Sequence, residues 1–220
     1  MSSMFETIME LPLFKGIGED QLSQLLEKTS IEFLKFEDGE YISRADKRVE
    51  AIDFILSGRV RQTYSLKNHP IEVDEILGKG AMIGALNLYG MVTNYFSASV
   101  ALGKVSVMII SKKQYIDILL SDGIYILNFV NFLSAAAQKA PTIMENLGAP
   151  SIRRTLETVA FSMVSRMSET VMIAGDDKDI AEFCGVTLEK FEEWKMSEMA
   201  HNRIIVNNRG VFLKSPHLLR

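Results

Sequence analysis

Closely spaced turn signals between residues 31 and 110 limit most strongly what this chain can fold into. Short runs rich in Val, Ile, Phe and Tyr are broken there by residues that favour turns: Asp38-Gly39, Ser57-Gly58, Asn68-His69-Pro70, Gly78-Lys79-Gly80 and Leu102-Gly103. Short strands with frequent turns are typical of antiparallel sheets, whose neighbouring strands are joined by tight connections. This part of the chain is therefore predicted to form a compact antiparallel β-barrel or sandwich.

Helices are predicted on both sides of this region. The first dozen residues and residues 19–29, with Leu22, Leu25 and Leu26 on one face, indicate short helices. After Ser111 a longer helix carries an apolar stripe formed by Ile116, Leu119, Leu120, Ile124, Leu127, Val130 and Leu133. Ile126, Phe129 and Phe132 make it apolar on almost all sides, so it must be covered, either by its own subunit or by a second copy. The second copy is favoured, with a dimer helix that uses Ile126, Phe129, Val130, Leu133 and Ala137.

The last third of the chain has a different pattern. Pro141 and Gly148-Ala149-Pro150 predict a hinge. Helices are then predicted at residues 152–167, 177–183 and 188–199, and a hairpin with strands at 204–206 and 211–213. Helix-turn-helix followed by a hairpin is a winged-helix arrangement.

Residues 79–98 have the backbone pattern of a phosphate cradle. Glycines allow a tight turn, and residues 86–89 can form one or two helical turns whose free N–H groups would face an anion. The positions that could supply positive charge are Ala85 and Phe96, however. The pattern therefore predicts a cradle that lacks the charges of a phosphate site.

The composition excludes several classes of protein. A net charge of -4 and a pI near 5.5 give no general attraction to nucleic acid, so any DNA binding needs a local patch. The single Cys184 can form no intramolecular disulfide and no cysteine-ligated iron–sulfur cluster within one chain. No apolar run reaches the roughly 18 residues that span a bilayer, and no signal peptide is recognisable, so we expect a cytoplasmic protein with no membrane partner.

Four local motifs accompany this order of parts: Leu11-Pro12-Leu13-Phe14, the run from Phe54 to Arg61 that contains Ser57-Gly58, Ile83-Gly84, and the run from Asp179 to Thr187. Together with the order of parts, these motifs resemble the Crp/Fnr family of bacterial transcription regulators over almost the whole chain. The resemblance implies an α+β fold: an antiparallel cyclic-nucleotide-binding-like jelly roll, a long dimerisation helix and a winged helix-turn-helix. It implies an effector-sensing domain at 1–110, a dimerisation helix and hinge at 111–147, and a DNA-binding domain at 148–220.

The resemblance also implies a homodimer that binds a palindromic site in double-stranded DNA, with RNA polymerase as a further partner. Its effector pocket would be formed by Gly84, Ala85, Leu86, Phe96, Ser97 and Ala98. Members that bind cyclic nucleotides have Glu and Arg where this chain has Ala85 and Phe96, so cyclic AMP is not the expected effector. Two alternatives stay open: an unidentified small molecule binds there, or side chains fill the pocket and no effector exists.

The DNA-reading helix also departs from the family pattern. By resemblance, the DNA-binding residues would be Thr187, Leu188, Glu189, Lys190, Lys195 and Arg209. The arginines that family members use are missing, and Glu192 and Glu193 would face or border a polyanion. A basic rim of Lys190, Lys195, Arg203, Arg209, Lys214, Arg153 and Arg154 is still available. The alternative is a ligand-binding or protein-interaction module that has lost sequence-specific DNA binding.

Neither catalysis nor metal binding is predicted. His69, His201 and His217 have no metal-ligand spacing, and no nucleophile–base set or carboxylate pair stands out. We therefore expect no catalytic residues, no metal and no cofactor, and not an enzyme. The operator sequence, the regulated genes, and activation as against repression are beyond the reach of the sequence.

Overall fold

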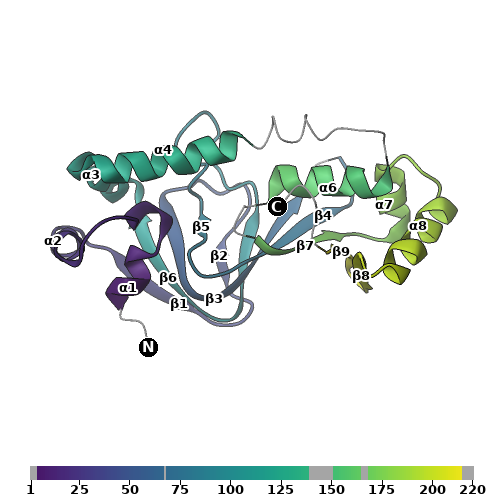
Figure 1. Ribbon diagram of the computed structural model, residues 1–220, viewed down its shortest axis with the longest axis horizontal. Helices are drawn as coiled ribbons and strands as arrows, with labels where there is room; N and C mark the ends of the chain where they lie inside the picture. Colours follow the sequence, from purple (N-terminus) through teal and green to yellow (C-terminus); the bar gives the residue numbers. More distant parts are fainter. Residues whose placement is uncertain (1–3, 67, 139–150, 165–167, 215–220) are drawn as a thin grey trace. The chain divides into compact units, whose positions relative to one another are not determined.

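The computed structural model describes residues 4–66, 68–138, 151–164 and 168–214, and its fold is α+β (Figure 1). The chain packs into two compact units. The first consists of Met1–Val60 and Gly78–Ala137, and the second of Arg61–Leu77 and Gln138–Arg220. The segment 61–77 therefore packs with the C-terminal part of the chain.

The first unit contains an antiparallel sheet, as predicted. Its central strand β6 (Ala98–Ser111) lies between β1 (Glu32–Phe36) and β3 (Ala51–Ser65), whose residues 51–60 belong to this unit. The short strands β2 (Tyr41–Ser43) and β5 (Met82–Ile83) pair with β6 and β3.

Two predicted turns do not interrupt strands. Ser57-Gly58 lies within β3 and Leu102-Gly103 within β6, and both strands continue through these positions. Gly58 and Gly103 have φ values of +89° and +75°, which favour glycine. A Cβ on Gly58 would lie 2.4 Å from the carbonyl oxygen of Lys104, so this glycine allows two backbones to approach closely rather than ending the strand.

Five helical segments accompany this sheet in the part of the first unit that the structure describes. They are α1 (Met4–Met9), the 3-10 turn η1 (Pro12–Phe14), α2 (Glu19–Lys28), α3 (Lys112–Ser121) and α4 (Gly123–Ala137). The predicted apolar face of α2 is confirmed, because Leu22 and Leu25 are buried. They join a core that includes Phe14, Phe54 and Tyr115.

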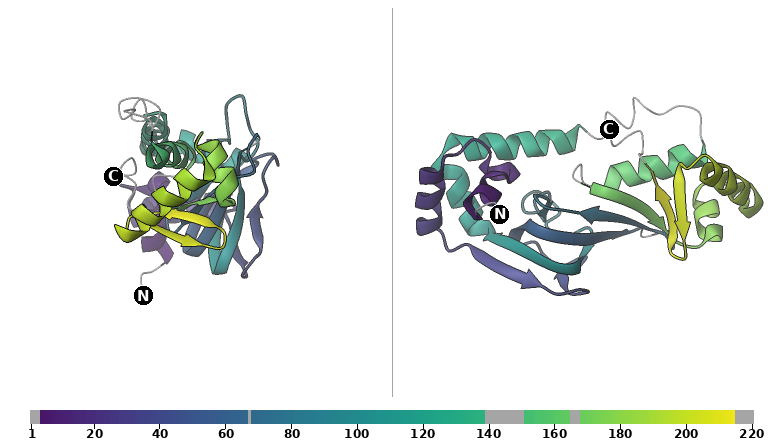
Figure 2. Two further views of the ribbon diagram at one scale, coloured as in Figure 1. Left: turned by 90° about the vertical axis from the view of Figure 1, so that its right-hand side faces the viewer. Right: turned by 60° about the horizontal axis from the view of Figure 1, so that its bottom comes forward.

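The single long helix predicted after Ser111 is wrong. The helix breaks at Asp122, and α3 and α4 are bent by 118° (Figure 2). Asp122 has an extended backbone with φ of −156°, and its carboxylate accepts a hydrogen bond from the backbone N–H of Ile124 at 2.9 Å. The carboxylate thus caps a new helix where the sequence pattern suggested a continuous one.

The two faces of α4 have different surroundings. Tyr125 is buried, and Phe129 packs edge-on against the rings of Tyr115 and Tyr89. Among the predicted dimer residues, Phe129 therefore belongs to the core of its own unit. The others, Ile126, Val130, Leu133 and Ala137, are exposed.

The second unit is built on another antiparallel set of strands. β4 (Glu72–Leu77) pairs with β7 (Ser168–Ala174), β7 with β9 (Gly210–Leu213), and β9 with β8 (Ile204–Asn207). The predicted hairpin is confirmed as β8–β9. The sequence pattern did not predict β7, and it did not predict that the ladder places Val73 opposite Ile173.

The helices in the described part of the second unit are α6 (Ile152–Met163), α7 (Asp177–Phe183) and α8 (Leu188–Ala200). Figure 1 shows α7 and α8 beside the β8 strand. The helix expected over 152–167 ends at Met163, because Val164 is extended. The core of the unit includes Leu156, Ile180, Phe191 and Val211.

The predicted domain boundaries remain predictions, because the two units are defined by packing alone. The hinge residues Pro141 and Gly148-Ala149-Pro150 lie outside the described residues. No described helix is by itself long and apolar enough to cross a bilayer; the bent pair α3 and α4 has the required length and composition only when taken together.

Candidate functional site

The glycine cradle begins where β5 ends. Gly84 has φ of +82°, and a Cβ there would lie 3.0 Å from the carbonyl oxygen of Ala51. The N–H of Asn87 donates to the carbonyl of Gly84 at 3.0 Å, which closes one turn. The helical turns expected over residues 86–89 are wrong, because no helix is present there. Asn87 Nδ2 instead donates to the carbonyl oxygen of Val92 at 3.3 Å, and Gly90, with φ of +98°, turns the chain back.

The predicted pocket residues are divided between the interior and the surface. Ala85 and Ser97 are buried, and Ala98 is half-buried. Leu86 and Phe96 are exposed; 61% of Phe96 is accessible. Neither Ala85 nor Phe96 carries a positive charge, so an anion in this cradle would lack a charge-assisted partner at both positions.

A buried carboxyl group lies beside the cradle, and it was missed by the sequence analysis. Asp53 is 6% exposed and stands opposite Ile83 in the β3–β5 ladder, next to Gly84. Burial raises the pKa of Asp53 to about 7. Burial also raises the pKa of Tyr95, and the charges of Asp53 and Glu50 add to this effect. The only signal in the sequence was an acidic residue inside an apolar run. When ionised, Asp53 would oppose an anionic ligand.

The helix-turn-helix segment is organised by local capping. The Asp176 carboxylate accepts a hydrogen bond from the N–H of Asp179 at 2.8 Å and caps α7. Gly185, with φ of +67°, forms the turn, and Thr187 Oγ1 accepts from the N–H of Lys190 at 3.3 Å to begin α8. The predicted DNA-contact residues Thr187, Leu188, Glu189 and Lys190 are all exposed.

The other two predicted DNA-binding cations are engaged in ion pairs. Lys195 Nζ is paired with the Asp177 carboxylate, and the Lys195 side chain is only 16% exposed. Arg209 Nη2 lies 2.8 Å from Asp74 Oδ2. To contact a phosphate, both cations would have to leave these partners.

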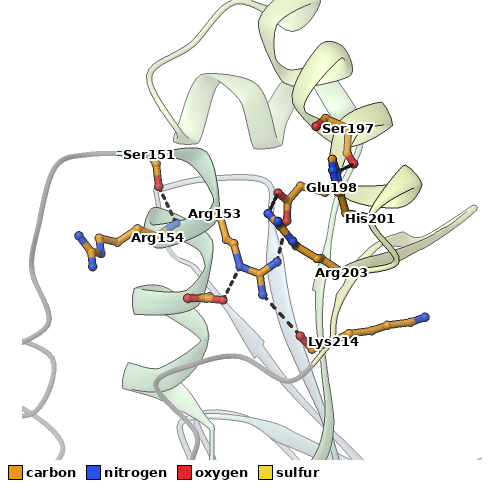
Figure 3. Close-up of polar contacts among 9 residues, drawn as sticks. Ser151, Arg153, Arg154, Ser197, Glu198, His201, Arg203 and Lys214 are labelled. Carbon is orange, nitrogen blue, oxygen red and sulfur yellow. Dashed lines mark hydrogen bonds and ion pairs between the residues drawn. The ribbon is translucent and has the colours of Figure 1, made fainter.

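A cluster of charged side chains joins α6 to α8 (Figure 3). Arg153 Nη1 donates to Glu198 Oε2 at 2.6 Å, and Arg153 Nε lies 2.8 Å from Glu157 Oε1. Arg203 Nη1 donates to Glu198 Oε1 at 3.0 Å. Arg153, Glu157 and Glu198 have side chains no more than 16% exposed. Two members of the predicted basic rim, Arg153 and Arg203, are therefore paired with Glu198 of α8 within the second unit.

A groove of about 420 Å³ in the second unit was also missed by the sequence analysis. It is lined by Ser65, His69, Pro70, Ile71, Glu72, Ala174, Gly175 and Arg209. Its walls come from the β3–β4 connection, the end of β7 and the β8–β9 turn, so only the tertiary structure brings them together.

Within the described residues, no group of three or more His, Cys, Asp or Glu side chains is arranged to hold a metal ion. The ring of His69 packs edge-on against Phe183, with centroids 5.0 Å apart, and His201 Nδ1 is hydrogen-bonded to the carbonyl of Ser197. His217 lies outside the described residues.

Burial raises the pKa of Cys184 to about 11, so its thiol is protonated and weakly nucleophilic at neutral pH.

Comparison with known proteins gives a partial family match and a chain-wide fold match. Residues 33–122 match the family of the cyclic nucleotide-binding domain. No similar protein was found among curated sequences.

Among solved structures, the catabolite activator protein of Thermus thermophilus is 15% identical, with a TM-score of 0.56 over 94% of this chain and 96% of that chain. The sensor domain of the transcriptional regulator DNR from Pseudomonas aeruginosa is 20% identical, with a TM-score of 0.50 over 60% of this chain and 91% of that chain. Residues 33–122 are thus similar to the cyclic nucleotide-binding domain, and over nearly its whole length the chain has the fold of the Thermus catabolite activator protein.

Proposed function

We propose that this chain is a homodimeric Crp/Fnr-type transcription regulator whose winged helix-turn-helix, formed by α7, α8 and the β8–β9 hairpin, binds double-stranded DNA. The observation that carries the proposal is the order of parts: a sheet with a glycine cradle, the α4 helix, and then helix, turn, helix and hairpin. The proposal implies a cytoplasmic location, no catalytic activity and, as a further partner, RNA polymerase.

The proposed dimer uses the outer face of α4. Ile126, Val130, Leu133 and Ala137 recur at intervals of four, three and four residues and are exposed. This spacing is that of a coiled-coil seam, and a second copy of the helix would bury it. The inward position of Phe129 removes it from the proposed interface.

The proposed effector is not cyclic AMP. The cradle places Ala85 and Phe96 where the resemblance implies Glu and Arg, and Asp53 adds a carboxyl group nearby. The amides of Gly84 to Leu86 would bind a neutral or weakly polar effector, with Ser97 beside them. A pocket that is closed by its own side chains remains the alternative.

DNA contact would begin at the N-terminal turn of α8. Thr187 and Lys190 lie at this exposed end, where the helix dipole and the lysine both favour phosphate. Because Lys195 and Arg209 are already paired, few cations are left for phosphate and we expect modest affinity, which falls as salt rises.

The test is to incubate the protein with sheared genomic DNA from its source, at low and near-physiological salt, and to sequence the retained fragments. Enrichment of a palindromic sequence supports the proposal, and retention no better than that of shuffled duplexes contradicts it. Lys190→Gln should weaken binding to all duplexes, whereas Lys178→Gln, an exposed lysine on α7, is the matched control.

A further inference from the structure

The outward face of α8 has an unusual composition for a surface that would meet DNA. Phe191 and Glu198 are buried on the opposite side, which fixes the orientation of the helix. The outward face consists of Glu189, Glu192, Glu193, Met196 and Met199, all exposed. This set is called the α8 acidic face below.

Negative charge dominates the segment that contains this face. Residues 176–200 carry eight carboxylate side chains and three lysines. One of these lysines, Lys195, points away from the outward face of α8 and is paired with Asp177 of α7. Glu198 is paired with Arg153 and Arg203. Among the described residues, no cation forms an ion pair with Glu189, Glu192 or Glu193. A polyanion would be repelled here, and a basic partner attracted.

The face also has an apolar end. Met196 is 65% exposed and Met199 is 48% exposed, one helical turn apart. Methionine is flexible and polarisable, so it packs against side chains of varied shape, and it is enriched in protein–protein interfaces. Exposed methionines next to carboxylates fit a partner that carries both positive charge and apolar side chains.

We propose that the α8 acidic face binds a basic amphipathic helix of another protein, whose lysines or arginines meet the glutamates and whose apolar side chains cover Met196 and Met199. This inference goes beyond the proposed DNA binding and does not depend on it. A partner on this face would cover the exposed end of α8, and so it would compete with any DNA bound there.

The probe for this test is a synthetic lysine–leucine peptide of about 18 residues, or five helical turns, with its leucines on one face. A peptide of the same composition with scattered leucines has the same charge and serves as its control. Fluorescence anisotropy with the full chain should show tighter binding of the amphipathic peptide. Met196→Ser combined with Met199→Ser should remove that preference.

Charge is tested with two matched triple variants. Replacing Glu189, Glu192 and Glu193 by glutamine should weaken binding of the amphipathic peptide about tenfold, since each exposed charge pair contributes a fraction of a kcal/mol. Replacing Glu19, Asp20 and Glu27, three exposed acids of α2, by their amides removes the same charge elsewhere and should leave binding unchanged.

Equal affinity for the two peptides, or equal losses in the two triple variants, would overturn the inference by reducing it to non-specific charge attraction. The glutamine variant of α8 should bind duplex DNA as well as or better than the natural chain. Weaker duplex binding would assign the glutamates to DNA and would also overturn the inference. If the natural chain binds no duplex at all, the proposed function fails while the peptide measurements still decide this inference.

Discussion

Arg209 Nη2 lies 2.8 Å from Oδ2 of Asp74, so the turn of the β8–β9 hairpin is paired with a strand that is more than 130 residues earlier in the chain. The Asp74 side chain is 3% exposed, and its other oxygen accepts a hydrogen bond from Thr63 Oγ1 at 2.6 Å. The pair lies within the second unit, next to the ladder between β4 and β7. A residue that the sequence assigned to DNA thus neutralises a buried carboxylate.

We predict that Arg209→Met lowers the free energy of unfolding by about 1–3 kcal/mol, because the buried Asp74 loses its cation. Urea denaturation measures the change. The exposed pair between Arg48 Nε and Glu50 Oε1, at 2.9 Å, provides the control, and Arg48→Met should change the same quantity by less than about 0.5 kcal/mol. Equal effects of the two substitutions would mean that the Asp74 pair contributes no more than a surface contact.

Glu198→Ala should destabilise the protein by about 3 kcal/mol, since it leaves the largely buried Arg153 with Glu157 as its one ion-pair partner among the described residues. Glu192, on the exposed side of the same helix, is the matched control, and Glu192→Ala should change stability by no more than about 0.5 kcal/mol. Thermal and urea unfolding of the two variants give the comparison. A Glu198 variant as stable as the control would contradict the proposed bracing of α6 against α8.

Asp53 predicts a specific pH dependence of stability. Burial raises its pKa from the ordinary value of 3.8 to about 7, so the folded protein binds more protons than the unfolded chain between these values. Its contribution to stability is therefore fully present below the lower value and is lost as the pH rises through about 7. The Asp53→Asn variant has no carboxyl group to ionise. Its free energy of unfolding, minus that of the natural chain, should therefore be about 2–3 kcal/mol larger at about pH 8 than at about pH 5.

Urea titrations of both proteins across this pH range measure the difference. Asp117→Asn, a substitution of an exposed aspartate on α3, controls for the loss of one charge and should give a curve parallel to that of the natural chain. Parallel curves for the natural chain and the Asp53 variant would show that Asp53 ionises at its ordinary pKa.

The proposed dimer predicts that Val130→Lys gives a monomer in sedimentation experiments while leaving the fold of the subunit intact. Val130 is 48% exposed, so a lysine there can be hydrated in the monomer but would be desolvated between two helices. Leu120 on α3 is 75% exposed and off the proposed seam, so Leu120→Lys should leave the dimer unchanged. A dimer that survives Val130→Lys at the same concentration would exclude this face of α4.

Apolar spacing predicted where helices occur better than it predicted what each side chain contacts. Ile126 and Phe129 were both predicted to lie in the dimer interface, yet Phe129 packs against Tyr115 in its own unit, whereas Ile126 is exposed. The break at Asp122 turns α4 relative to α3, so residues on one continuous stripe in the sequence do not share one face in space. Likewise, the positive charge of Lys195 was evident in the sequence, but its pairing with Asp177 depends on how α7 packs against α8.

The sequence by itself determined the elements whose stability is local. The antiparallel strand region, the α7–turn–α8 segment and the β8–β9 hairpin follow from side-chain periodicity, capping residues such as Thr187 and turn residues such as Gly185, which act within a few residues of each other. Only the tertiary structure decided that β4 pairs with β7, that Arg209 neutralises Asp74, and that Asp53 is buried beside Gly84. These features depend on which distant segments of backbone pair and on how much water they exclude. The spacing of neighbouring residues encodes neither the pairing nor the exclusion of water.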